Sequence, residues 1–147
     1  MLSIFQPDVP QAFSSDEAFD AFVKSSCDHL TDGTSRAVHI VRNAELVVKV
    51  ALDHNKIVCN WIEVVAFFYF RGDQNKLARI VSWSRSCRFI VMEKLDTSIQ
   101  SCGSFIPPAW VTDTGLKNGG VDVDGNYKLC DYAFVKSPDE AYRTPYV

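Results

Sequence analysis

The hydrophobic and polar positions of this chain predict two amphipathic helices. Ser14 followed by Glu17 matches a capping box. The helix that follows would end near residue 26, with Phe19, Phe22 and Val23 on its apolar face. Residues 55–70 are long enough for a second helix, whose predicted buried face comprises apolar residues at helical spacing: Ile62, Val65, Ala66 and Tyr69.

Short runs rich in β-branched residues predict strands between and after these helices. They form three hairpins: 37–41 with 45–51, 78–84 with 87–92, and 121–123 with 127–130. The predicted order is helix, strand, strand, helix, strand, strand, followed by a loop-like stretch over residues 96–108 and the last tight hairpin. The three tryptophans are predicted to lie in the core: Trp61, Trp83 and Trp110.

Composition narrows the class of protein. A length of 147 residues with 47% hydrophobic residues fits one domain, with a lead-in and helix over 1–30, a sheet-rich part over 31–95 and a smaller part over 96–147. The net charge of −3 and dispersed Lys and Arg disfavour nucleic-acid binding, whereas an acidic surface suits a basic partner protein. The longest apolar run, 64–70, is too short to cross a bilayer.

Cysteine usage predicts the compartment. Five cysteines form no CxxC pair, and no signal peptide is visible at the N-terminus. We therefore expect reduced thiols in a cytoplasm. The three histidines have no metal-ligand spacing with one another or with the cysteines, so a zinc site is not predicted.

Polar residues at ordered intervals carry the candidate chemistry. Lys49 lies in the apolar strand Val-Val-Lys-Val-Ala, and Glu63 follows fourteen residues later on the predicted helix. Near the C-terminus, Asp113 is followed by Asn118 five residues on and by Asp131 after thirteen more. In this order the residues resemble the protein-kinase-like superfamily, in particular the small kinase-like proteins of bacteria and their phages.

The resemblance implies a role for each of these residues in ATP- and magnesium-dependent phosphoryl transfer. Lys49 would contact the α and β phosphates, and Glu63 would pair with Lys49. Asp113 would orient the acceptor hydroxyl, while Asn118 and Asp131 would hold Mg²⁺.

Two further segments complete the implied nucleotide site. Gly33 and Ser35 lie in the stretch that matches the phosphate-covering loop. The segment from Met92 through Glu93 to Leu95 resembles the hinge that would meet the adenine, with Met92 at the back of the pocket.

Several departures from the family pattern bear on activity. Val111 and Thr112 replace the histidine and arginine that usually precede the catalytic aspartate, and Ala133 replaces the glycine of the metal-binding tripeptide. The stretch between the hinge and Asp113 is too short for the usual supporting helices, and Pro107 with Pro108 opposes a long helix there.

The resulting fold prediction is α+β: a truncated protein-kinase-like fold with an antiparallel sheet, a packed helix and a much reduced C-terminal lobe. Two functions stay open. One is a minimal phosphotransferase using ATP and Mg²⁺, which acts on a host protein and whose missing substrate platform a dimer mate or the target itself would supply. The other is a catalytically inactive phage effector, located in the host cytoplasm, that binds and inhibits a host protein without chemistry.

Overall fold

A five-stranded antiparallel sheet forms the centre of the protein. The computed structural model describes residues 8–99, 105–112 and 118–133. The strands lie in the order β1-β2-β3-β5-β4. Their bounds are Cys27–Asp32 for β1, Arg36–Val41 for β2, Leu46–Ala51 for β3, Ile80–Trp83 for β4 and Phe89–Glu93 for β5.

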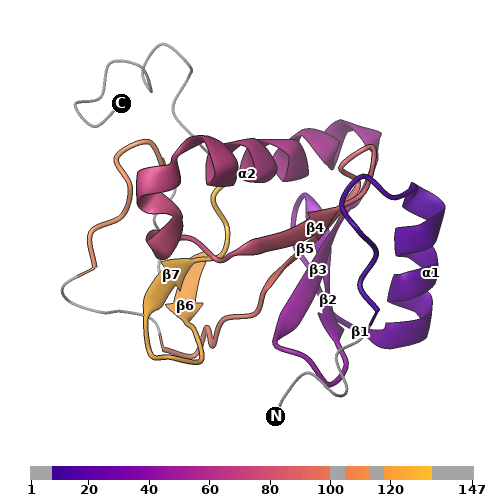
Figure 1. Cartoon of the computed structure of the whole chain (residues 1–147), viewed down its shortest axis with the longest axis horizontal. Helices are drawn as coiled ribbons and strands as arrows, with labels where there is room; N and C mark the ends of the chain where they lie inside the picture. The colour runs from indigo at the N-terminus through magenta and orange to yellow at the C-terminus, as the bar shows by residue number, and fades with distance from the viewer. Residues whose placement is uncertain (1–7, 100–104, 113–117, 134–147) are drawn as a thin grey trace.

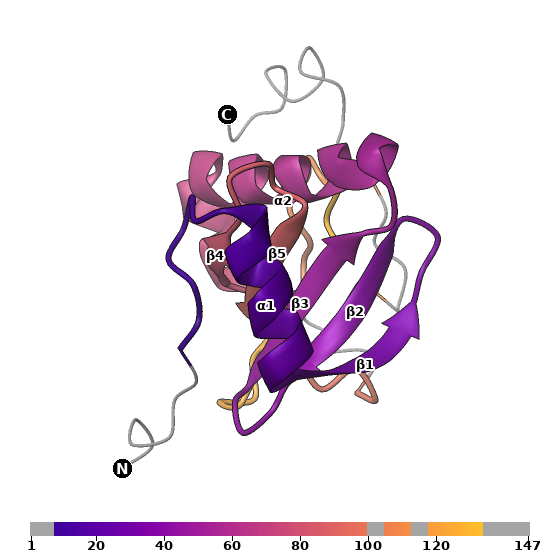
Figure 2. The ribbon, with the colours of Figure 1, turned by 90° about the vertical axis from the view of Figure 1, so that its right-hand side faces the viewer.

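One helix covers each face of this sheet (Figures 1 and 2). Residues of β5 alternate between the two faces, as side chains of a strand must. Phe89 and Val91 pack with Phe19 and Phe22 of helix α1, which spans Asp16–Ser26. Ile90 and Met92 pack on the other face with residues of helix α2, which spans Ile57–Tyr69 and follows a 3₁₀ turn over His54–Lys56. Strand β5 is therefore buried on both sides.

The predicted first helix is present, but its cap is one residue later than expected. The hydroxyl of Ser15, at the N-cap, accepts a hydrogen bond from the amide of Ala18 at 3.2 Å. The carbonyl of Ser14 instead accepts from the amide of Arg85 at 2.9 Å, in the β4–β5 loop. Ser14 thus ties the start of the helix to the sheet.

Strand β1 was not predicted. Its residues, Cys-Asp-His-Leu-Thr-Asp, include few β-branched side chains, and all but Cys27 are exposed. It pairs with β2 at the edge of the sheet, with an irregularity in register between His29 and Thr31. The observed order therefore has three strands before α2, where the sequence predicted two.

The buried face of α2 is also different from the predicted one. Its buried residues are Asn60, Glu63, Val64, Ala66 and Phe67, whereas Val65 and Tyr69 are exposed. The helix is apolar nearly all round, so the spacing of apolar residues does not distinguish the inner face from the outer one. Trp61, predicted to be in the core, is 52% exposed.

A small second sheet lies below the 3₁₀ segment Arg71–Lys76 that follows α2 (Figure 1). It pairs β6, Gly119–Val121, with β7, Tyr127–Leu129. The sequence predicted this hairpin with its first strand at residues 121–123, but that strand ends at Val121, because residues 122–126 form the turn. The turn contains Gly125 at φ +86°, a backbone conformation that favours glycine. Isolated bridges pair Leu129 of this sheet with Leu77, which precedes β4, and Val121 with Asp96, which follows β5.

The described residues after Leu95 contain no α-helix. Trp110 lies in the core of this smaller part, at 0% exposure. Its ring stacks on Phe70 with a centroid distance of 4.5 Å. The predicted α+β class and the antiparallel sheet with its packed helix are confirmed.

Candidate functional site: a buried ionic cluster

The carboxylate of Glu63 is the centre of a buried ionic cluster between the sheet and α2. Glu63 is 0% exposed. Its carboxylate accepts from Lys49 Nζ at 3.0 and 3.3 Å. Lys49 alternates with Val48 along β3, and because Val48 faces α1, the Lys49 side chain faces α2. The sheet and the helix therefore bring these two predicted residues together.

Arg36 is a second cation on the same carboxylate, and the sequence analysis missed it. Its guanidinium donates to Glu63 Oε1 at 2.6 Å and to Oε2 at 3.0 Å. This is the two-pronged geometry in which arginine binds carboxylates most specifically. Arg36 begins β2, and its side chain is only 6% exposed.

Arg36 also extends the cluster to the C-terminal part of the chain. Its Nη2 donates to Asp131 Oδ1 at 2.8 Å, and Nη1 donates to Asn60 Oδ1 at 3.2 Å. Arg36 therefore bridges two carboxylates: that of Glu63, which was predicted to pair with Lys49, and that of Asp131, which was predicted to hold magnesium.

The backbone of residues 130–132 closes the cluster. The carbonyl of Cys130 accepts from Lys49 Nζ, and the amide of Tyr132 donates to Glu63 Oε2 at 2.9 Å. The Tyr132 hydroxyl donates to the carbonyl of Ala78 at 2.9 Å. The segment that carries Asp131 is thus tied to β3, to α2 and to Ala78, two residues before β4.

The electrostatics of the cluster follow from its burial and from its two cations. Burial alone would raise the pKa of Glu63, but Lys49 and Arg36 lower this pKa to about 2. Burial alone would lower the pKa of Arg36, but Glu63 and Asp131 raise it. The formal charges of the two cations and of the carboxylates of Glu63 and Asp131 sum to zero.

The other predicted magnesium and catalytic residues lie partly outside the cluster. Asn118 is buried, at 5% exposure, and its carbonyl accepts from the amides of Cys130 at 2.8 Å and Asp131 at 3.3 Å. This contact places the backbone of Asn118 beside that of Asp131. Asp113 lies outside the described residues, so its predicted role is not tested.

The predicted phosphate-covering residues form the tight turn between β1 and β2. The amide of Gly33 donates to the carbonyl of Arg36 at 2.8 Å, and the carbonyl of Ser35 accepts from the amide of Leu52 at 3.0 Å. The turn therefore leads directly into Arg36. Contact of Gly33 or Ser35 with phosphate stays a prediction.

The predicted hinge residues are engaged in packing and in a second ion pair. Met92 and Leu95 belong to the core on the α2 side of the sheet, at 0% and 7% exposure. The Glu93 carboxylate pairs with Lys128 at 2.9 Å and accepts from the amide of Arg79 at 3.0 Å. Backbone contact of this segment with adenine stays a prediction.

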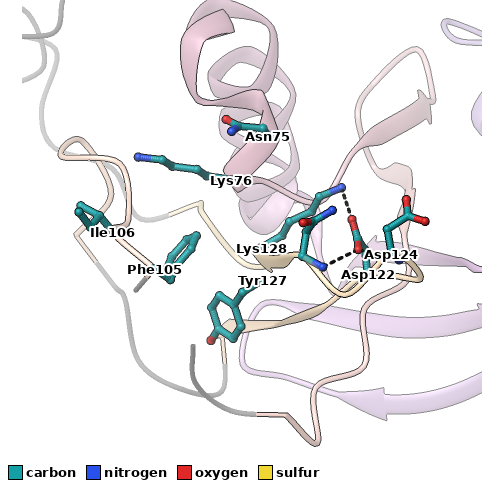
Figure 3. A pocket seen from close by; sticks show the side chains of 9 residues that line it. Asn75, Lys76, Phe105, Ile106, Asp122, Asp124, Tyr127 and Lys128 are labelled. Atoms are coloured by element: carbon teal, nitrogen blue, oxygen red, sulfur yellow. Dashed lines mark hydrogen bonds and ion pairs between the residues drawn. The ribbon is translucent and has the colours of Figure 1, made fainter. Parts of the chain in front are cut away.

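An open hollow of about 630 Å³ lies beside the β6–β7 hairpin, several of whose residues line it (Figure 3). Lys128 lines it together with Asp122, and their side chains pair at 3.0 Å. The remaining lining residues come from the end of the 3₁₀ segment, residues 105–106 and the hairpin turn: Asn75, Lys76, Phe105, Ile106, Asp124, Asn126 and Tyr127. None of the predicted site residues that the structure describes lines it.

The described residues contain neither a candidate metal site nor a membrane-spanning helix. No group of three or more His, Cys, Asp or Glu side chains in these residues could hold a metal ion. None of the described helices is long and apolar enough to cross a membrane. The described cysteines, Cys27, Cys59, Cys87 and Cys130, are free thiols.

Comparison with known proteins gives a partial structural similarity. No family model matches the chain, and no curated protein matches it. Among solved structures, the chain is similar to the ADP-bound crystal structure of the aminoglycoside phosphotransferase APH(2'')-Ib, with a TM-score of 0.40 and 18% identity. The alignment covers 55% of this chain and 28% of that protein.

Proposed function

We propose that this chain is a kinase-like binding protein that acts on a partner protein without transferring phosphate. The observation that carries the proposal is the position of Arg36 between Glu63 and Asp131. The buried guanidinium of Arg36 donates a hydrogen bond to Asp131 Oδ1, an oxygen of the carboxylate that was predicted to hold magnesium.

The site residues do not fit a magnesium nucleotide in this arrangement. Lys49 is 6% exposed and donates to Glu63 and to the Cys130 carbonyl, so its ammonium points into the protein. A cluster with no net charge also lacks the positive field that attracts a triphosphate. Binding would require Arg36 to release Asp131.

The ionic cluster is better explained as a contact that holds the fold together. It links β2, β3, α2 and residues 130–132, which are far apart in the sequence. In the same proposal the partner is a host protein that the chain inhibits in the cytoplasm, since the small proteins that it resembles occur in phages and bacteria.

A phosphotransferase is the second candidate, and one observation favours it. The Asp131 side chain is 39% exposed, and only its Oδ1 is engaged by Arg36. The second oxygen is therefore positioned to accept a ligand if Arg36 moves. Lys49 and Glu63 already form the ion pair that this chemistry uses.

A thermal-shift titration separates the two candidates. We expect millimolar ATP with Mg²⁺ to leave the melting temperature of the full chain unchanged, because the cluster is satisfied by its own charges. A ligand at one hundred times its Kd would stabilise the fold by about 2.7 kcal/mol, which is several degrees for a domain of this size.

Asp131→Asn is the matched control, because it keeps the size of the side chain and removes its charge. We expect it to show the same lack of response to nucleotide. A rise in the wild-type melting temperature that Asp131→Asn abolishes would support the phosphotransferase instead.

A further inference from the structure

The outer face of α2 exposes an apolar stripe. Val58, Trp61, Val65 and Phe68 are 51%, 52%, 42% and 44% exposed, and they recur at helical spacing. The only charged residue of α2 is Glu63, which is buried in the cluster. The stripe is therefore uncharged along the helix.

Two further aromatic rings extend the stripe toward the edge of the sheet. Phe68 contacts Trp83 of β4 with a centroid distance of 5.4 Å, and Trp83 contacts Phe13 at 5.3 Å. Phe13 is 60% exposed, and its amide donates to the carbonyl of Trp83 at 2.9 Å. We call the surface formed by the stripe, Trp83 and Phe13 the α2 face.

Exposed arginines border the α2 face at both ends. Arg71 follows the end of α2, and Arg85 lies two residues after Trp83. Within the described part of the chain, no ion pair engages the guanidinium group of Arg71 or Arg85. The guanidinium of Arg88 lies over the ring of Phe89, 5.4 Å from its centroid, on the α1 side of the sheet, so Arg88 is not part of this border.

The charge of this region differs from that of the whole chain. Residues 54–95 contain seven Lys or Arg and three Asp or Glu, whereas the whole chain has 15 and 18. One of these three acids, Glu63, is enclosed in the cluster, and Glu93 is paired with Lys128. Asp73 accepts from Trp110 Nε1, and Asp16, nearby on α1, accepts from Ser86. The border of the α2 face is therefore cationic on an acidic protein.

The size of the α2 face suits a short segment better than a second copy of this chain. Phe13, Trp61 and Phe68 are each about half exposed, and aromatic side chains have roughly 150–250 Å² of surface, so they expose on the order of 300 Å². The smaller Val58 and Val65 and the partly buried Trp83 add less than this. A stable interface buries roughly 800 Å² on each partner. A second copy would also place its own arginines against those of the first, and like charges repel each other.

We infer that the α2 face binds an amphipathic segment of the partner protein, with apolar side chains flanked by Asp or Glu. Trp61 and Phe68 would contact its apolar side chains, and the arginines would contact its carboxylates. This inference rests on the proposed function, since it names the kind of partner that such a binding protein would take.

The test uses two labelled helical peptides with the same leucine positions, one with glutamate and one with lysine at all polar positions. Fluorescence anisotropy with the full chain is expected to show at least tenfold tighter binding of the glutamate peptide, and added salt is expected to weaken it. Equal affinity for the two peptides would overturn the inference.

Variants locate the binding surface. We expect Trp61→Ala to weaken binding of the glutamate peptide about tenfold, and the double variant Arg71→Glu, Arg85→Glu to reverse the preference between peptides. Leu30→Ala is the control, since Leu30 is 56% exposed on β1, away from the α2 face. An unchanged affinity in Trp61→Ala, with a normal melting curve, would contradict the inference.

The same measurements distinguish a peptide from a second copy of the chain as the occupant of the α2 face. They also distinguish failure of this inference from failure of the proposed function. Absence of peptide binding together with a dimer in sedimentation that Trp61→Ala dissociates would overturn the inference in favour of a second copy. If no peptide binds and ATP causes no thermal shift, the inference fails while the proposed lack of nucleotide dependence stands. If the glutamate peptide binds but ATP stabilises the fold, the inference stands and the proposed function fails.

Discussion

Replacing Glu63 with glutamine is expected to lower the free energy of unfolding by about 3–5 kcal/mol. Glutamine keeps the shape of the side chain but removes the anion that compensates Arg36 and Lys49. Both cations are nearly fully buried, at 6% exposure each, so water cannot replace the lost carboxylate without opening the fold. Urea denaturation at neutral pH measures the effect.

The matched control is Glu45→Gln, because Glu45 is exposed in the turn before β3. We expect it to change stability by less than about 0.5 kcal/mol. A loss of less than about 1 kcal/mol in Glu63→Gln would show that the cluster is not closed in solution.

The same variant tests the pKa of Glu63 through the acid dependence of stability. This pKa is about 2 in the folded protein, against 4.5 for an unperturbed glutamate, so the ionised form stabilises the fold. The contribution is fully present above pH 4.5 and is lost as the pH falls toward 2. At about 1.4 kcal/mol for each pKa unit, it amounts to about 3 kcal/mol. The stability of Glu63→Gln should therefore decline less over this range.

Replacing Trp110 with alanine is the second change with a large expected effect, a loss of about 3–5 kcal/mol. Trp110 is fully buried, stacks on Phe70 and contacts Tyr132 edge-on at 6.4 Å. Its Nε1 donates to Asp73 at 2.9 Å. Alanine would leave a large cavity between the end of α2 and the segment that carries Asp131. Urea denaturation measures the loss.

Trp110→Phe separates the packing of Trp110 from its hydrogen bond. Phenylalanine keeps a ring on Phe70 but removes the donor to Asp73, and we expect a loss of about 1–2 kcal/mol. If Trp110→Ala costs no more than Trp110→Phe, residues 105–112 do not pack on α2 as described.

The central strands could be predicted because their sequence signal is local. The runs around Lys49 and Phe89 are β-branched and apolar, and they became β3 and β5. Alternation along β3 then turns Lys49 toward α2, which explains its contact with Glu63. Strand β1 gave no such signal, because an exposed edge strand needs no apolar side chains.

Arg36 could have been found from the same alternation. Val38 lies opposite Lys49 in the β2–β3 pair, and residues two apart on a strand share a face. Arg36 therefore lies on the face of Lys49, once β2 is known to begin at Arg36 rather than Ala37. Its contact with Asp131 could not be predicted, because it joins residues 95 positions apart through tertiary packing alone.

The orientation of α2 was the largest error of the sequence analysis. Apolar residues occur on both sides of this helix, and two polar residues, Asn60 and Glu63, lie on its inner side. Asn60 and Glu63 find their hydrogen-bond and ion-pair partners in Arg36 of β2 and Lys49 of β3, which the sequence of the helix alone does not reveal. The exposed side of α2 then contains the stripe that the proposed partner would cover.

The contact between Arg36 and Asp131 is tested most directly by a double-mutant cycle with Arg36→Met and Asp131→Asn. Unfolding free energies are measured for the four proteins with and without ATP and Mg²⁺. We predict a coupling of about 1 kcal/mol between the two residues, the same in both conditions. A coupling near zero, or one that disappears when ATP and Mg²⁺ are added, would contradict a structural role for the cluster.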